Sequence, residues 1–116
     1  MKQLVSILLL LFISSFNIQC RRKPFKSVAS SYWKYIDEDI QYEIYLKPDG
    51  HIYSYHPNDP TPENDLWKQT GNKFYFSMND DYAHYKGKFI NDSTCTGTGK
   101  SKGFRWKWTA KLISKD

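Results

Sequence analysis

The sequence contains little that could support redox or metal chemistry. Only two of the 116 residues are cysteine, Cys20 and Cys95. They form no Cys-x-x-Cys pair and no cluster with histidine, so thiol-redox and zinc sites have no basis. The three histidines, His51, His56 and His84, include no pair at metal-binding spacing, because His51 and His56 would face opposite sides of a regular strand. We therefore expect no cofactor and no metal.

The chain also lacks the length and the pattern of a helical or multidomain protein. At 116 residues it forms one domain at most. Long helical periodicity is absent, and only three residues are alanine. By contrast, 40% of the residues are apolar and 17% are aromatic, which excludes a wholly disordered chain.

The first 20 residues, MKQLVSILLLLFISSFNIQC, have the form of an export signal. A short positive region at Lys2 precedes an apolar stretch over residues 4–13, which is too short for a spanning helix. The signal ends at Cys20, and this placement resembles a bacterial lipoprotein with a relaxed lipobox, Asn17-Ile18-Gln19. The resemblance implies that residues 1–19 are a signal helix and that Cys20 carries the lipid. Two alternatives stay open: ordinary secretion with cleavage after Ala29, and an uncleaved membrane anchor.

The net charge of +5 comes from the N-terminal region. Lys2 lies in the signal, and four cations lie within residues 21–26, namely Arg21, Arg22, Lys23 and Lys26. Residues 27–116 carry 12 Lys and Arg against 12 Asp and Glu, so this part is formally neutral. We expect residues 20–30 to be a basic tether near anionic lipid, and we expect no nucleic-acid partner.

From residue 31 onward, apolar and polar residues alternate with period two. This pattern, with a turn signal every 6 to 12 residues, predicts eight strands. The predicted strands span residues 31–36, 41–47, 51–56, 65–70, 73–78, 82–90, 93–100 and 103–113. Turn signals such as Pro48-Asp49-Gly50 and Asn79-Asp80-Asp81 separate them, and residues 57–64 form the one longer loop.

Eight short strands with short connections predict an all-β, antiparallel up-and-down meander closed into a barrel over residues 31–113. The last strand gives the clearest register. We expect Phe104, Trp106 and Trp108 to point inward, and the alternating basic residues to point into solvent. Glycines within the strand patterns, Gly87, Gly97 and Gly99, suit close packing at barrel corners.

The body resembles the small lipocalin-like (calycin) domains of bacterial envelope proteins. The residues that carry this resemblance run from Trp33 through Asp49-Gly50, Trp67, Phe74-Tyr75-Phe76-Ser77, Tyr85-Lys86-Gly87, Gly97-Thr98-Gly99 and Trp106-Lys107-Trp108-Thr109-Ala110. They are core and turn residues, so the resemblance implies a fold more than an activity.

Catalytic constellations are scarce. The acidic groups Asp37-Glu38-Asp39 and Asp80-Asp81 lie in predicted turns, where Asp is common for backbone reasons. Acid–base catalysis by either group, or calcium binding by the first, is the alternative. Gly97-Thr98-Gly99-Lys100 lacks the spacing of a phosphate-binding loop. We therefore expect no enzyme, unless the folded chain shields a cluster of carboxylates.

The aromatic residues are the richest candidate functional material. Most should fill the core, and the rest could line a ligand site or form a stacking platform. The ligand-binding residues expected are Trp33, Trp67, Tyr85, Trp106 and Trp108. We expect a monomeric, non-enzymatic envelope lipoprotein, bound to membrane lipid through Cys20 and the tether, that takes an apolar or aromatic ligand or a protein partner. The alternative is an inhibitor or immunity-type protein that uses the 57–64 loop.

Overall fold

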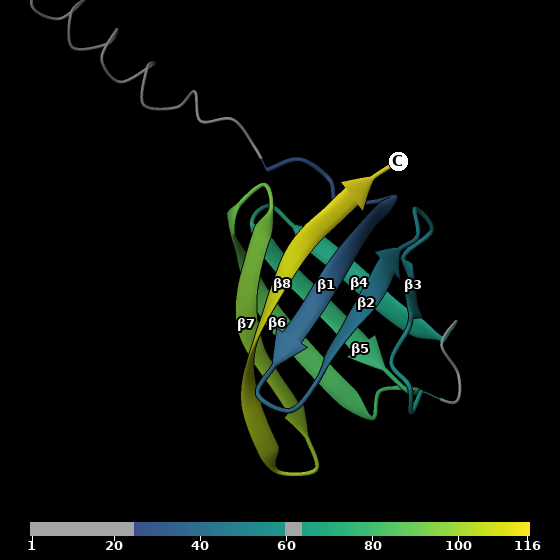
Figure 1. Cartoon of the computed structure of the whole chain (residues 1–116), viewed down its shortest axis with the longest axis vertical. Helices are drawn as coiled ribbons and strands as arrows, with labels where there is room; N and C mark the ends of the chain where they lie inside the picture. The colour runs from purple at the N-terminus through teal and green to yellow at the C-terminus, as the bar shows by residue number, and fades with distance from the viewer. Residues whose placement is uncertain (1–24, 60–63) are drawn as a thin grey trace, which may run out of the picture.

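The computed structural model describes residues 25–59 and 64–116, and it contains eight β-strands (Figure 1). All eight lie at the positions that period two predicts, within one or two residues at most ends. The strands are β1 (Ser31–Asp37), β2 (Gln41–Leu46), β3 (His51–Ser54), β4 (Asp65–Thr70), β5 (Lys73–Met78), β6 (Ala83–Asn91), β7 (Thr94–Ser101) and β8 (Phe104–Lys115).

The strands form a closed antiparallel barrel in chain order. Each strand pairs with the next, and β8 returns to pair with β1. The meander is possible because tight turns join most neighbours, with Gly50, Gly71 and Gly103 at positive φ where a side chain would be strained. The predicted fold class is therefore confirmed. Among the described residues there is no helix long and apolar enough to cross a membrane.

Alternate residues of each strand point into the barrel and form one core. Rings occupy the middle of the interior: Tyr35, Phe76, Tyr85 and Trp108 contact one another at centroid distances of 4.0 to 6.3 Å. The other buried apolar residues are Val28, Trp33, Tyr42, Ile44, Leu46, Ile52, Phe74, Met78, Ala83, Phe89, Cys95 and Ala110. An eight-stranded barrel has just enough interior for its own side chains, and here aromatic rings fill much of it.

Three glycines let the two C-terminal indoles and the strands approach closely. A Cβ on Gly87 would lie 2.6 Å from the Trp108 ring, and one on Gly99 would lie 2.4 Å from the Trp106 ring. A Cβ on Gly97 would lie 1.9 Å from the carbonyl oxygen of Lys86. These glycines therefore allow the close packing that was predicted from their positions within strands.

Residues 25–30 cover one end of the barrel, which we call the entry end because the described chain starts there (upper end, Figure 1). Val28 is buried, and its N–H donates to Oε1 of Gln69 at 3.0 Å. The Ser31 hydroxyl donates to the Val28 carbonyl, and the Phe25 ring stacks on Phe89 at 6.4 Å. Part of the segment expected to be a tether thus packs against the barrel, whereas Cys20 lies outside the described residues.

The β7–β8 hairpin extends beyond the rest of the opposite end of the barrel (Figure 1). Pairing of β8 with β1 stops at Asp37 opposite Trp108, so Phe104 and Trp106 lie beyond the last residue of β1. Trp108 is buried as predicted, and Trp106 is half-buried. The inward position predicted for Phe104 is wrong: no facing strand covers it, and it is 75% exposed.

Candidate functional site

A pocket of about 250 Å³ opens at the end of the barrel opposite the entry end. We call it the mouth pocket. It lies between the loop after β3, the β5–β6 turn and the extended β7–β8 hairpin. Its lining residues are His56, Asn58, Asp59, Met78, Asn79, Tyr82, Ala83, Tyr85, Ser101 and Trp106. The pocket therefore combines aromatic faces with amide, hydroxyl and carboxylate groups.

A chain of hydrogen bonds holds the Trp106 indole in the wall of this pocket. Its Nε1–H donates to the Tyr35 hydroxyl at 2.8 Å, and that hydroxyl donates to Oδ2 of Asp37 at 2.6 Å. The other carboxylate oxygen of Asp37 accepts the backbone N–H groups of Asp39 and Ile40. Asp37 thus closes the β1–β2 turn and fixes Tyr35, which in turn fixes Trp106. This confirms the backbone role expected of an acid in this turn.

Three tyrosines, Tyr35, Tyr42 and Tyr85, form the floor below the mouth pocket. Burial raises the pKa of Tyr35 and of Tyr42 far above the ordinary value, and it raises the pKa of Tyr85 to about 12. The Tyr42 ring lies edge-on to His56 at 4.7 Å, and its hydroxyl donates to the sulfur of Met78 at 3.5 Å. The three hydroxyls stay protonated at neutral pH, so the floor is polar without carrying charge.

Asp65 is a fully buried carboxyl beside the mouth pocket. Its Oδ1 accepts the backbone N–H of Asn79 at 2.9 Å and so anchors the β5–β6 turn. That turn contains three consecutive residues at positive φ, Asn79, Asp80 and Asp81, a conformation that Asn and Asp tolerate better than other side chains. Burial, reinforced by the neighbouring Asp59 carboxyl, raises the pKa of Asp65 to about 7.

The five expected ligand-binding residues lie in different parts of the barrel. Tyr85 and Trp106 line the mouth pocket, with their rings edge-on at 5.7 Å. Trp108 lies deeper, against Tyr85 at 6.3 Å. Trp33 is near the entry end, buried, with its Nε1–H donating to the Ser31 hydroxyl at 2.7 Å. The structure thus brings Tyr85, Trp106 and Trp108 together and keeps Trp33 apart.

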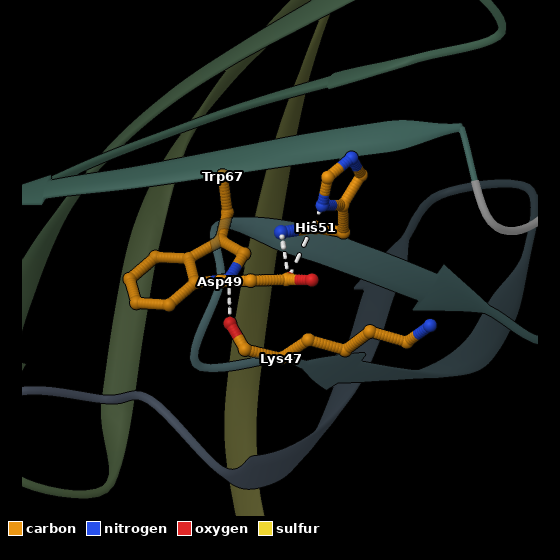
Figure 2. Close-up of polar contacts among 4 residues, drawn as sticks. All are labelled: Lys47, Asp49, His51 and Trp67. Carbon is orange, nitrogen blue, oxygen red and sulfur yellow. Dashed lines mark hydrogen bonds and ion pairs between the residues drawn. The ribbon is translucent and has the colours of Figure 1, made fainter.

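Trp67 is separate from the mouth pocket and braces the β2–β3 turn (Figure 2). Its indole Nε1–H donates to the Lys47 carbonyl at 2.8 Å. In the same turn, Oδ1 of Asp49 accepts the backbone N–H of His51 and lies 3.1 Å from the His51 ring nitrogen. These bonds lower the pKa of Asp49, the backbone one first. All four residues have a structural reason for their positions.

Tyr35, Tyr42 and Asp65 are site residues that were not predicted from the sequence. The burial of Asp65 could have been predicted from the sequence, because Asp65 has the same strand parity as Trp67 and therefore points inward with it. The role of the tyrosines could not have been predicted, because nothing in a period-two pattern separates a ring in the core from a ring beneath a pocket. Of the 57–64 loop, Asn58 and Asp59 line the mouth pocket, and residues 60–63 lie outside the described part of the chain.

Tyrosines also line the outer face of β1, β2 and β3. Tyr32 pairs with Tyr45, and Tyr45 pairs with Tyr53, so the three form one lateral row. The rings of Tyr32 and Tyr45 are 4.4 Å apart, and Tyr53 contacts the half-exposed Tyr55 at 4.9 Å. These tyrosines therefore lie on the outside of the barrel and not in its core.

Comparisons with known proteins gave no match: no family model, no curated protein and no solved structure is detectably similar to the chain. Within the described residues, no group of three or more His, Cys, Asp or Glu side chains is arranged to hold a metal ion. The mouth pocket therefore has to be interpreted from its own chemistry.

Proposed function

We propose that the protein is a lipocalin-like envelope lipoprotein, anchored through Cys20, that binds a small ligand or a partner's side chain in the mouth pocket without catalysis. The observation that carries this proposal is the position of the pocket. It opens at the end of the barrel opposite the one where the described chain begins at Phe25. An anchor attached through the N-terminal segment would then leave the pocket facing away from the membrane.

The lining favours a ligand ring that has apolar faces and also carries polar substituents, such as a sugar. Trp106, Tyr82 and Tyr85 offer aromatic surface, on which the apolar face of a sugar can stack. Asn58, Asp59 and Ser101 offer donors and acceptors around it. A volume of about 250 Å³ is below the range typical of drug-sized ligands, so the pocket suits one ring-sized group.

Asp65 is the feature that a hydrolase would need, yet its contacts favour a structural role. It is shielded and has a raised pKa, as a general acid would. However, it is 0% exposed, and its Oδ1 already accepts the Asn79 N–H. A substrate in the mouth pocket would meet Asp59 and the aromatic rings first.

Replacing Trp106 by alanine should weaken ligand binding at least about tenfold, because it removes one wall of the pocket. The measurement is a tryptophan-fluorescence titration with a panel of monosaccharides and disaccharides. Phe104→Ala is the matched control, since Phe104 lies two residues away on β8 and is exposed outside the pocket. Binding that survives Trp106→Ala unchanged, or a panel without any binder, would rule out the mouth pocket as a sugar site.

Lipid attachment at Cys20 has an independent test. Radiolabelled palmitate should enter the full-length protein in a bacterial host that processes lipoproteins, and Cys20→Ala should abolish the label, because lipidation requires that thiol. Cys95→Ala should keep the label, since the Cys95 side chain is buried in the barrel and burial raises its pKa to about 12. Equal labelling of the wild type and Cys20→Ala would contradict the anchor.

A further inference from the structure

Residues 27–116 are formally neutral, but their positive charges are concentrated on one part of the barrel surface. Nine of the 12 Lys and Arg residues in this range lie at exposed positions on β4 to β8. They are Lys68, Lys73, Lys86, Lys88, Lys100, Arg105, Lys107, Lys111 and Lys115. The one acidic residue on these five strands is Asp65, which is buried. We call this outer surface of β4 to β8 the basic face.

The strand register places these cations in lateral rows. Lys86 pairs with Thr98, which pairs with Lys107; in the next row His84 pairs with Lys100, which pairs with Arg105. Neighbouring strands lie about 4.8 Å apart, and alternate residues along one strand lie about 6.6 Å apart. The basic face is therefore a lattice of positive charge with short spacings in both directions.

Two hollows deepen the middle of the basic face. One, of about 420 Å³, is lined by His84, Lys86, Lys100 and Arg105 together with residues of β7. The other, of about 390 Å³, extends from His84 and Lys86 toward β4. Because His84 and Lys86 line both hollows, the two hollows lie next to each other on the basic face.

Asp81 lines the hollow toward β4, whereas no carboxylate among the described residues lines the hollow over β6 to β8. Among the described residues, the one contact within salt-bridge distance is between the His51 ring and the Asp49 carboxylate, on the β2–β3 turn. Within the same part of the chain, the cations of the basic face have no carboxylate at that distance, and they repel one another across the short spacings. A multivalent anion would relieve that repulsion and would gain the entropy of the counterions it releases.

We infer that the basic face binds an anionic polysaccharide, a chain whose repeating units carry phosphate, sulfate or carboxylate groups. A flat anionic membrane fits less well, because Lys86, Lys100 and Arg105 line a hollow that offers no large apolar side chain for insertion. Single-stranded nucleic acid fits less well: aromatic residues, among them Trp67 and Tyr75, line the hollow toward β4, but the hollow that holds Lys100 and Arg105 has no ring on which bases could stack. This site is distinct from the mouth pocket and goes beyond the proposed function.

The test uses the full-length protein in a neutral detergent, with dextran sulfate as the probe and uncharged dextran of equal length as the blank. We expect binding to dextran sulfate alone, with an affinity that falls as salt rises. The double change Lys86→Glu with Arg105→Glu should weaken it at least about tenfold at about 50 mM salt. The milder pair Lys86→Gln with Arg105→Gln should reduce the slope of log K against log salt by about two.

The control is Lys34→Glu with Lys47→Glu, which changes the net charge equally but lies on β1 and the β2–β3 turn. It should keep most of the affinity, and circular dichroism should show all the variants folded. If the control pair loses as much affinity as Lys86→Glu with Arg105→Glu, the effect is one of net charge alone, and the proposed site is wrong. Tighter binding to single-stranded DNA of equal charge would overturn the polysaccharide. Trp106→Ala should leave dextran sulfate binding intact, so failure of the mouth pocket and failure of the basic face can be told apart.

Discussion

Trp108→Ala is expected to lower the free energy of unfolding by about 3 to 5 kcal/mol, the range for a large aromatic residue deleted from a core. Trp108 is 2% exposed, and it packs on Tyr35, Phe76 and Tyr85 in the middle of the barrel. Its indole N–H has no hydrogen-bond partner within the described part of the chain, so the loss is one of packing. Denaturant unfolding at constant m-value measures it.

Three further variants test whether the loss of stability comes from packing and whether the register of β8 is correct. Trp106→Ala should cost less, about 1 to 2 kcal/mol, because its ring is half-buried and its Nε1–H bonds the Tyr35 hydroxyl. Lys107→Ala should stay within about 0.5 kcal/mol, since that side chain is exposed. Trp108→Phe should recover part of the stability by refilling the site. A Lys107→Ala loss as large as that of Trp108→Ala would contradict the register of β8.

Asp65→Asn is expected to stabilise the fold above pH 7 and to remove a pH dependence. The pKa of Asp65 is about 7 in the folded chain, against about 3.9 for an unperturbed Asp. Between these values the folded state binds the extra proton, so the stability that this group contributes is complete below about pH 4 and is lost as pH rises through 7. Since each pKa unit corresponds to about 1.4 kcal/mol, the loss by pH 8 is on the order of 2 to 4 kcal/mol.

Thermal or urea unfolding of the wild type and of Asp65→Asn from pH 4 to pH 8 measures this effect. Asparagine keeps an oxygen for the Asn79 N–H, so the β5–β6 turn should remain anchored. Asp81→Asn serves as the control, because Asp81 is exposed in the same turn and should leave the slope unchanged. If Asp65→Asn keeps the same decline toward pH 8, then Asp65 is not its source.

The strands and turns could be predicted because each depends on neighbours in the sequence. Period two marks a strand with one buried face, and Pro48-Asp49-Gly50 or Gly71-Asn72 marks where the chain reverses. Short turns then left few ways to connect eight strands other than a closed meander. In such a fold, local signals carry most of the topology.

Two features that could not be predicted from the sequence, the exposure of Phe104 and the basic face, depend on how the strands are staggered. Phe104 has the strand parity of a core residue, but β1 ends before it and leaves it uncovered. Where one strand ends relative to another that is far away in the chain cannot be predicted from the sequence of either strand. The separation of charge was hidden for a similar reason. Summing charges gives zero, and only the lateral register shows that Lys86, Lys107 and Arg105 share a face whose strands carry no exposed carboxylate.

Closure of the barrel also has a kinetic consequence. Seven of the eight strand pairs join strands that follow each other directly in the chain, and each can form as soon as its hairpin is complete. The eighth joins β1 to β8, where Tyr35 and Trp106 are 71 residues apart when their side chains bond. Because long-range contacts close slowly, this last pair should set the folding rate. Until it forms, β1 and β8 remain open edges, and the hydrogen bond that orients Trp106 is absent, so the mouth pocket is completed only in the final step of folding.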